Sequence, residues 1–591
     1  MKITGSQIVI ECLVEQGVKT VFGYPGGAIL NIYDELYKNS DRITHILTAH
    51  EQAACHAADG YARSTGKVGV CMATSGPGAT NLVTGIATAY MDSIPIVAIT
   101  CNVVKPLLGK DSFQEIDITG VTMPITKHNF MVMDVNNLAE TIREAFVIAK
   151  TGRPGPVLID IPKDVTAALC EFEPLKNPDE AVSKAALEKT NLKRSLTVSV
   201  PSEEQIKAAA EMINSSERPI IYAGGGVKIS GAEKELLELA EKAEIPVSES
   251  LMGRDVFPAK HRLCTWMVGM HGTNASNLGI TNSDLVIAIG SRFSDRVLGD
   301  PKHFAANSKI LHIDIDPAEI NKNVMTDNCL VGDVKQVLTS LLPHVKKASH
   351  TEWLSQIDEW KKDVPECYGK EPKDSINPKF ICECINRIAG DDTFITTEVG
   401  QHQMWTAQFY PFNKPRTFNT SGGLGTMGFG TGAAIGIQCA NPKARVVHIA
   451  GDGSFRMNCN ELATIQHYNL PIVIVVVNNG SLGNVRMWQK IFYGNRFSQT
   501  TLDFGPDWLK LADAYGIDSF RANNAKEFEK VFEKAFSLHK PCIIDAKVDI
   551  DEMVRKNLEK VNKKRAPSSG IIYTASSNPP QQLRWQLLQN I

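Results

Sequence analysis

A glycine-rich turn at the end of an apolar strand limits what this chain can fold into. Residues 445–450 form a strand pattern that runs into Gly451-Asp452-Gly453-Ser454, and a more apolar strand, 471–477, runs into Asn478-Asn479. A helix pattern that begins at Asn460 lies between them, which predicts a βαβ unit with both polar turns at the carboxyl ends of its strands. That edge is where open parallel sheets bind ligands.

The residues of these two turns suit a metal ion and a phosphate group. Asn479 stands 27 residues after Asp452, one strand further along the chain. A carboxylate at one strand end and a side-chain amide at the next can share one hard cation, while the glycines let backbone N–H groups approach a diphosphate. A lone Gly-Asp-Gly turn is a weak signal, but this spacing and sheet context predict a cradle for magnesium and a diphosphate.

Strand and helix patterns alternate along most of the 591 residues, a length too great for a single core. This alternation predicts an α/β protein built from doubly wound parallel sheets. We expect an N-terminal domain at 1–175, a linker at 176–200, a central domain at 201–345, a connector that begins with a helix at 346–376, a third domain with the cradle at 377–550, and a tail at 551–591. Strands of the first domain are expected at 20–23, 45–48, 68–72, 95–99 and 153–160.

Composition excludes several classes of protein. A net charge of −3, with Lys and Arg scattered along the chain, argues against nucleic acid as a partner. No apolar run approaches the roughly 18 residues of a membrane helix, and Glu11 interrupts the first segment before a signal-type core develops, so we expect a cytoplasmic protein without a membrane anchor. The odd count of 13 cysteines predicts reduced core residues.

A series of motifs along residues 1–554 carries a family resemblance. They include Phe22-Gly23-Tyr24-Pro25-Gly26-Gly27-Ala28, His50-Glu51-Gln52, Ala73-Thr74-Ser75-Gly76-Pro77-Gly78-Ala79-Thr80-Asn81, Phe113-Gln114-Glu115, Leu251-Met252-Gly253, Val399-Gly400-Gln401-His402-Gln403-Met404-Trp405 and Gly422-Gly423-Leu424-Gly425-Thr426-Met427-Gly428. In these motifs the chain resembles the thiamine-diphosphate enzymes, and most closely the large catalytic subunit of acetolactate synthase, also called acetohydroxyacid synthase. The resemblance implies three α/β domains that are pyrimidine-binding, FAD-type and diphosphate-binding.

The resemblance implies a catalytic role for Glu51, Gly27 and Gln114. The matching glutamate hydrogen-bonds the aminopyrimidine ring of the cofactor and promotes loss of the thiazolium proton. Read from the residue alone, Glu51 is better explained as a carboxylate that the helix dipole favours at a helix N-terminus, and the resemblance reverses that preference. Gly27 and Gln114 match positions at the reacting centre.

Further positions follow from the same resemblance. Cofactor contacts are implied for Pro25, Gly26, Val399, Gln401, His402, Gly425, Met427, Gly451, Gly453 and Ser454, and metal ligands for the side chains of Asp452 and Asn479 and the backbone carbonyl of Ser481. FAD contacts are implied for Gly224, Gly290, Arg292 and Asp314. Substrate contacts are implied for Phe113, Lys127, Met252, Arg296 and Trp488, although Lys127 read alone is a solvated lysine, and Trp488 and Met427 read alone are core side chains.

The resemblance implies thiamine diphosphate, Mg²⁺ and FAD as cofactors, with FAD structural because carboligation has no net redox change. The implied reaction decarboxylates pyruvate and joins the hydroxyethyl unit to a second 2-keto acid, pyruvate or 2-ketobutyrate, in branched-chain amino acid biosynthesis. Glu51 and the cradle lie in different domains, so one cofactor must be held between two domains. Relatives hold it between two chains, and the resemblance therefore implies a homodimer or homotetramer. The sequence leaves open whether a small regulatory subunit binds this chain. A related 2-keto-acid decarboxylase or pyruvate oxidase is the main alternative, and a non-catalytic nucleotide-binding scaffold is a second one.

The sequence departs from the family pattern at a few positions. Asn484 stands where relatives place a methionine toward the cofactor, and Cys101-Asn102 replaces a common Gly-Gln. Glu398 replaces a frequent aspartate, and Thr431-Gly432 replaces a common Leu-Pro. Because Glu51, Asp452 and Asn479 are retained, we expect the cofactor chemistry to be unchanged. The departures leave open which second keto acid the enzyme prefers.

Overall fold

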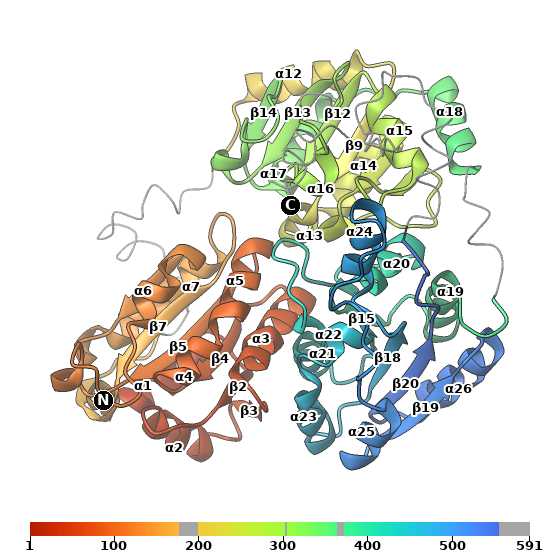
Figure 1. The fold of residues 1–591 in the computed structure, drawn as a ribbon. Helices are drawn as coiled ribbons and strands as arrows, with labels where there is room; N and C mark the ends of the chain where they lie inside the picture. The colour runs from red at the N-terminus through yellow and green to blue at the C-terminus, as the bar shows by residue number, and fades with distance from the viewer. Residues whose placement is uncertain (176–198, 302–303, 363–371, 555–591) are drawn as a thin grey trace. The chain divides into compact units, whose positions relative to one another are not determined.

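The computed structural model describes residues 1–175, 199–301, 304–362 and 372–554 (Figure 1). Contacts divide the chain into two compact units. Of the described residues, the first unit combines 1–175, 392–403 and 419–548, and the second combines 199–301, 304–362, 372–391, 404–418 and 549–554. The predicted linker and tail lie almost entirely outside the described residues. In the described ranges no helix has the length and apolar character needed to cross a bilayer.

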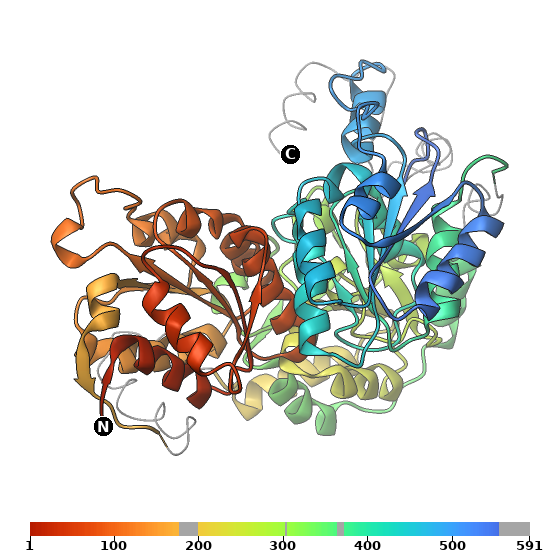
Figure 2. The same cartoon turned by 90° about the horizontal axis from the view of Figure 1, so that it is seen from below.

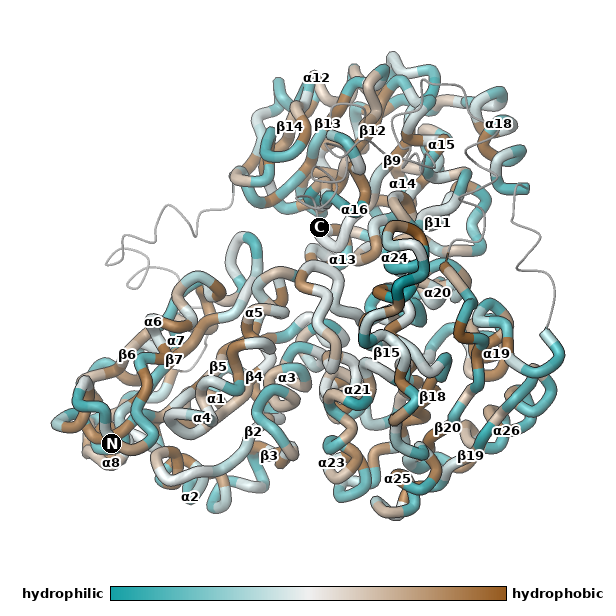
Figure 3. The backbone as a smooth tube through the Cα atoms, viewed as in Figure 1, coloured by the Kyte–Doolittle hydropathy of each residue, from teal (hydrophilic) through white to brown (hydrophobic). Residues whose placement is uncertain are grey.

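The N-terminal sheet of the first unit has six parallel strands in the order β3-β2-β4-β5-β7-β6. They are β2 (Thr20–Tyr24), β3 (Thr44–Leu47), β4 (Gly69–Ala73), β5 (Ile96–Asn102), β6 (His128–Met131) and β7 (Val157–Pro162). Its helices are α1 (Gly5–Glu15), α2 (Leu30–Lys38), α3 (Glu51–Thr65), α4 (Pro77–Asn81), α5 (Val83–Asp92), α6 (Ile118–Thr122), α7 (Leu138–Lys150) and α8 (Lys163–Ala167). Every residue of β4, β5 and β7 is buried, because helices cover both faces of a parallel sheet. Figure 3 shows that these central strands are largely apolar.

All five strands expected in this domain are confirmed, and two features were not predicted. One is the edge strand β6. The other is an antiparallel pair of short strands, β1 (Lys2–Thr4) and β8 (Leu169–Glu171), which joins the two ends of the domain. Three-residue strands are too short to carry a period-2 signal in sequence.

The C-terminal sheet of the same unit has the order β16-β15-β17-β18-β20-β19, and its pairs from β15 to β19 are parallel. Its strands are β15 (Phe394–Thr397), β16 (Phe418–Asn419), β17 (Val446–Gly451), β18 (Ile472–Asn478), β19 (Asp518–Ala522) and β20 (Cys542–Lys547). Its helices are α21 (Phe429–Ala440), α22 (Asp452–Phe455), α23 (Leu462–His467), α24 (Gly483–Phe492), α25 (Trp508–Ala514) and α26 (Ala525–Ser537), and helix α20 (Gln401–Phe409) begins in this unit and continues into the second. The predicted βαβ unit is therefore β17, α22 with α23, and β18.

Helices α3 and α21 join the two sheets of the first unit, and they lie side by side in both views (Figures 1 and 2). A Cβ atom on Gly436 would overlap the carbonyl oxygen of Ala57, and one on Gly60 would overlap the carbonyl oxygen of Ala433. Glycine at these two positions lets the helix backbones touch. The N-terminal sheet, whose strand β3 precedes Glu51, and the C-terminal sheet, whose strand β17 ends just before Asp452, thus share one apolar core.

The second unit contains a six-stranded parallel sheet in the order β11-β10-β9-β12-β13-β14. Its strands are β9 (Pro219–Ala223), β10 (Val247–Glu249), β11 (Cys264–Met267), β12 (Leu285–Ile289), β13 (Lys309–Asp314) and β14 (Asn328–Val331). Its helices are α12 (Glu203–Asn214), α13 (Gly225–Ser230), α14 (Glu233–Lys242), α15 (Asn274–Asn282), α16 (Asp295–Leu298), α17 (Val334–Leu341), α18 (Thr351–Lys362) and α19 (Pro378–Ala389). Helix α18 is the helix expected at the start of the connector, and its Trp353 donates a hydrogen bond to the Pro219 carbonyl oxygen at 2.9 Å.

Candidate active site

Glu51 is the first residue of α3, just after β3, and its side chain is 8% exposed. The amide of Asn81 donates a hydrogen bond to Glu51 Oε2 at 2.9 Å. Around the other oxygen the packing is close: a Cβ atom on Gly78 would lie 3.2 Å from Glu51 Oε1 and 2.8 Å from the Thr74 methyl group, so the turn fits here only with glycine. One carboxylate oxygen thus accepts a hydrogen bond from Asn81, and the other lies close to Gly78.

The segment from Thr74 to Asn81 gathers the other residues predicted at the reacting centre. Thr74 accepts a hydrogen bond from the Ala28 amide at 3.2 Å, and a Cβ atom on Gly26 would overlap its methyl group. Gln114 has a backbone φ of 59°, and its main chain packs so closely on Gly76 that a Cβ atom there would lie 2.8 Å from Gln114 Cα. The structure therefore brings the loop of Gly26, Gln114 and Glu51 together around one short segment.

A lysine that the sequence analysis missed holds the adjoining glycine loop. Lys163 Nζ, at the start of α8, donates a hydrogen bond to the Gly27 carbonyl oxygen at 2.9 Å. Nothing lies within 4 Å of a Cβ atom built on Gly27, and its neighbour Pro25 is exposed. The loop 25–27 is thus anchored through its backbone while its outer side stays open.

The residues predicted to form the metal cradle lie at the ends of β17 and β18, which pair up to Gly451 and Val477. Asp452 begins α22 and is 6% exposed; burial raises the pKa of its carboxyl to about 7. Asn479 Oδ1 accepts hydrogen bonds from the Ser481 amide at 3.1 Å and the Ser481 hydroxyl at 3.2 Å. The bridge between Ser481 and Thr501 uses the Gly480 carbonyl and the Leu482 amide, so it leaves the Ser481 carbonyl out of its hydrogen bonds.

The start of α20 packs on this cradle. Gln401 Oε1 accepts a hydrogen bond from the Asn479 amide at 3.0 Å, and a Cβ atom on Gly483 would overlap the same oxygen. The His402 ring lies 2.5 Å from the position of a Cβ atom on Gly451, and burial lowers the pKa of His402 to about 4, which keeps the ring neutral. Gln401 and His402, both predicted to contact the cofactor, thus lie against the two glycine turns.

The loop with Met427 rests on a buried glutamate. Glu398 accepts hydrogen bonds from the Gly428 amide at 2.6 Å, the Ser454 hydroxyl at 2.8 Å and the Thr431 amide at 3.1 Å. Burial raises the pKa of Glu398, but hydrogen bonds from His448, Ser454 and the Thr431 amide outweigh burial and hold it below its ordinary value. Val399 lies next in sequence, 4.0 Å from the position of a Cβ atom on Gly425.

Helices of the N-terminal sheet hold the upstream part of that loop. Arg63 of α3 donates a hydrogen bond to the Thr420 carbonyl oxygen at 2.8 Å and forms an ion pair with Asp92 at the same distance. Asp92 in turn accepts hydrogen bonds from the amides of Gly422 and Gly423. Among the described residues, however, no hydrogen bond or ion pair joins Glu51 to Asp452 or Asn479 within the chain.

Predicted substrate residues of the first unit lie in varied surroundings. Phe113 is 88% exposed, and Trp488 stacks on Phe492 along α24 with 5.2 Å between ring centroids. The ammonium group of Lys127 donates hydrogen bonds to the carbonyl oxygens of Ile148 and Thr151 at the end of α7. That position gives Lys127 a helix-capping role, and its place in a substrate channel stays a prediction.

The predicted FAD residues of the second unit lie at the carboxyl ends of the neighbouring strands β9, β12 and β13. The Gly224 turn meets Gly290, whose φ is 56°, so closely that a Cβ atom on Gly224 would overlap the Gly290 carbonyl oxygen. Asp314 ends β13, and the carbonyl oxygen of Arg292 accepts a hydrogen bond from Asn323 at 3.2 Å. In the same unit Met252 lies in the 3₁₀ turn η4 (Leu251–Gly253), and Arg296 lies in α16 with a half-exposed side chain.

Comparison with known proteins assigns the chain to a family. The thiamine pyrophosphate enzyme family models match it three times: the N-terminal TPP binding domain at residues 3–121, the central domain at 206–341 and the C-terminal TPP binding domain at 398–546. The chain is 50% identical to the probable acetolactate synthase large subunit of Methanocaldococcus jannaschii, with 92% of each chain covered. It is 46% identical to the acetolactate synthase large subunit of Porphyra purpurea, with 93% of this chain and 92% of that one covered.

This chain belongs to the acetolactate synthase family of thiamine pyrophosphate enzymes. The acetolactate synthase of Mycobacterium bovis, at 45% identity over 94% of this chain and 89% of that one, extends the family across distant organisms. Glu51 and Gly27 lie in the range matched by the N-terminal TPP binding domain, and Asp452 and Asn479 lie in the C-terminal one.

Several residues around the acetolactate synthase site were not singled out from sequence. Asn81 and Thr74 lie inside a motif that carries the resemblance, so that motif was the signal for both. Glu398 stood out only as a departure from the family pattern, and Lys163 carried no signal because a lysine after a strand is common. Asn81, Glu398 and Lys163 are found by their hydrogen bonds to Glu51, Ser454 and Gly27, and Thr74 is found by its close contact with Gly26.

Proposed function

We propose that this chain is the catalytic subunit of an acetolactate synthase. It decarboxylates pyruvate and joins the remaining two-carbon unit to a second 2-keto acid, pyruvate or 2-ketobutyrate, in branched-chain amino acid biosynthesis. The observation that carries the proposal is the 45–50% identity, over more than nine-tenths of this chain, to proteins named acetolactate synthase. The grouping of Glu51, Gly27 and Gln114 around one segment supports it.

Thiamine diphosphate, when bound, supplies an acidic carbon that attacks the keto group and an electron sink for the pair left by carbon dioxide. Glu51 would hold a proton at the pyrimidine ring with Oε1, the oxygen that does not accept the Asn81 hydrogen bond. Gly27 and Gln114 would orient the keto acid, and Met427 would support the bent cofactor. The loop around Pro25 and Gly26 would border the pyrimidine ring.

Mg²⁺ would take oxygen ligands from Asp452, Asn479 and the Ser481 carbonyl. A buried carboxyl whose pKa is raised to about 7 lacks a nearby cation, and a divalent ion would favour its ionised form. Oxygen donors from a carboxylate, an amide and a carbonyl are also the set that hard cations prefer. The diphosphate would lie on the backbone of Gly451, Gly453 and Ser454, with Val399, Gln401, His402 and Gly425 beside it.

FAD is the proposed structural ligand of the second unit, at the strand ends with Gly224, Gly290, Arg292 and Asp314. The buried His312 Nδ1 has no hydrogen-bond partner among the residues the structure describes, and it lies on β13 two positions before Asp314. An orphan polar atom near this edge fits a polar ligand there.

The proposed assembly is a homodimer or homotetramer in the cytoplasm. Tyr24 and Leu47, the last residues of β2 and β3, are 43% and 42% exposed, and Phe113 is 88% exposed. Exposed apolar side chains beside Glu51 support a second copy that covers this edge and brings its own cradle. A small regulatory subunit is a further proposed partner, since several relatives are named large subunits.

The proposed acceptor pocket contains Phe113, Lys127, Met252, Arg296 and Trp488. An arginine there would bind the carboxylate of the second keto acid. If Trp488 packs against the additional methyl group of 2-ketobutyrate, discrimination between the two acceptors amounts to about 1–3 kcal/mol.

The test is the variant Glu51→Gln, assayed with pyruvate, thiamine diphosphate and Mg²⁺ for acetolactate, acetaldehyde and peroxide. Loss of an acid at the pyrimidine ring predicts at least about a 100-fold lower rate with unchanged unfolding behaviour. Glu35→Gln, at a glutamate that is 7% exposed and bonded to Lys38, is the matched control and should retain activity. A fully active Glu51→Gln protein would reject the assignment, and acetaldehyde or peroxide as the wild-type product would favour a decarboxylase or an oxidase.

A further inference from the structure

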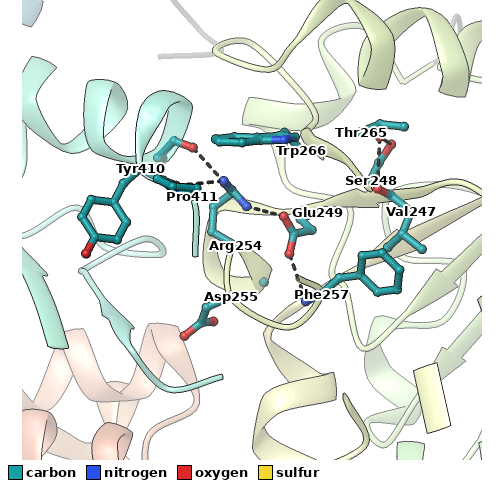
Figure 4. A network of polar contacts seen from close by, with 12 residues as sticks. Val247, Ser248, Glu249, Arg254, Asp255, Phe257, Thr265, Trp266, Tyr410 and Pro411 are labelled. Carbon is teal, nitrogen blue, oxygen red and sulfur yellow. Dashed lines mark hydrogen bonds and ion pairs between the residues drawn. The ribbon is translucent and has the colours of Figure 1, made fainter. Parts of the chain in front are cut away.

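The second unit contains a completely buried arginine, Arg254, that is not among the residues assigned to the reaction above (Figure 4). Arg254 forms an ion pair with Glu249, the last residue of β10, and both side chains are fully buried. Its other donors reach backbone oxygens, that of Ala407 at 2.8 Å and that of Tyr410 at 3.3 Å. Trp266 covers one face of the guanidinium, with 4.5 Å from Cζ to the ring centroid.

This network fixes the turn η4 to the chain segment 407–418. Glu249 also accepts a hydrogen bond from the Phe257 amide at 3.2 Å, so the pair closes both ends of residues 249–257. Asp255, next to Arg254, pairs with Lys228 at 2.7 Å and accepts a hydrogen bond from the Phe418 amide at 3.0 Å. Two successive buried charges therefore tie the same turn to the same segment.

Met252 lies inside the turn that is held in this way. Ser250 caps η4 through the Gly253 amide, and a Cβ atom on Gly253 would lie 2.6 Å from the Ala223 carbonyl oxygen. The Met252 side chain lies 3.2 Å from the position of a Cβ atom on Gly225, at the same junction of β9 and α13. The turn η4 thus contacts the junction of β9 and α13 directly and is tied through Arg254 and Asp255 to the segment 407–418.

Stability alone does not explain such a pair. Burial raises the pKa of the Glu249 carboxyl, and the charge of Arg254 opposes that shift without cancelling it. The attraction between the two charges therefore only partly offsets the cost of removing the carboxylate from water. Buried ion pairs are often replaceable by apolar side chains without loss of stability, whereas removing one partner leaves an unpaired charge. A directional role, in which the planar guanidinium fixes several groups at once, fits its contacts better.

We propose that Arg254 is a positioning residue for acceptor choice, because it fixes the turn that holds Met252. The inference rests on the proposed function, in which Met252 lines the acceptor pocket. Arg254 would act through the backbone of η4 and would not contact the substrate. Its loss would therefore alter how well the second keto acid fits while the decarboxylation of the first pyruvate continues.

The test compares Arg254→Lys with wild type in a competition between pyruvate and 2-ketobutyrate. Lysine retains the charge beside Glu249 but has no planar fork to reach Ala407 and Tyr410 together. We expect the product ratio to shift by about threefold to tenfold and the acceptor KM to change, with the carbon dioxide release rate within about twofold of wild type. Arg143→Lys is the matched control, because Arg143 also pairs with a glutamate, Glu15, and donates to a carbonyl, that of Glu173.

The outcomes separate the inference from the proposed function. Wild-type protein that forms no acetolactate would refute the function itself. Active wild-type protein with an unchanged product ratio in folded Arg254→Lys would refute only the positioning role, as would an equal shift in Arg143→Lys. If Arg254→Lys does not fold, Glu249→Gln, which keeps a hydrogen-bond acceptor of the same shape, should shift the ratio in the same way, and an unchanged ratio there also overturns the inference.

Discussion

Replacing the buried carboxyl of Asp160 with an amide is expected to change how stability depends on pH. Asp160 lies on β7 and is 1% exposed. It accepts hydrogen bonds from the Thr100 hydroxyl at 2.8 Å and the Asn102 amide at 2.7 Å. Burial raises its pKa from the ordinary 3.8 to about 6, although both hydrogen bonds lower it.

The sign follows from which state holds the proton more tightly. A raised pKa in the folded state means that the contribution of Asp160 to stability is complete below about pH 4 and is lost as the pH rises through about 6. A shift of about two pKa units at 1.36 kcal/mol each corresponds to about 3 kcal/mol. Asp160→Asn cannot lose a proton, so its stability relative to wild type should rise by about 3 kcal/mol between pH 4 and pH 7.

Thermal unfolding of both proteins from pH 4 to pH 8 measures this change. At about 2–4 °C per kcal/mol for a domain of 150–250 residues, the Tm difference should grow by several degrees across that range. Asn102→Ala is a second variant to measure. It removes an amide donor that lowers the pKa of Asp160, so the pH at which stability is lost should be higher than in wild type. A Tm difference between Asp160→Asn and wild type that stays constant with pH would refute the reasoning.

Three other substitutions test contacts of the site. Gly436→Ala should lower the free energy of unfolding by about 1–3 kcal/mol, measured by denaturant titration, because its Cβ atom overlaps the Ala57 carbonyl and α21 must move; wild-type stability would contradict the backbone contact. Lys163→Met should lower kcat by about tenfold with an unchanged Tm, since the Gly27 carbonyl loses its donor, and full activity would show that the loop needs no such anchor. Asp452→Asn should weaken Mg²⁺-dependent binding of thiamine diphosphate by about 100-fold in calorimetry, and unchanged binding would remove Asp452 from the metal site.

Much of the fold was predictable because buried parallel strands are written as continuous apolar runs. Strands β4, β5 and β18 follow that rule and were placed within a few residues. Strand β6 was missed because its four residues, His128–Met131, are only half-buried at a sheet edge and show no alternation. Edge strands depend on pairing that local sequence does not encode.

The candidate site divides in the same way. Asp452 and Asn479 were found because strand ends on a parallel sheet meet at one edge. The hydrogen bond from Asn81 to Glu51 and that from Lys163 to Gly27 depend on how distant segments pack, and no spacing rule predicts them. The burial of Arg254 was not predicted for the same reason. Arg and Asp in a turn are usually exposed to solvent, and only the packing of distant segments buries them here.

The seam between α3 and α21 also limits how this protein can change. Where helices touch through side chains, a larger residue on one is absorbed by a smaller residue on the other, but a main-chain contact offers no such compensation. Directed evolution toward new acceptors should therefore keep Gly60 and Gly436 and vary residues in the loops, where substitutions do not change the contact between α3 and α21.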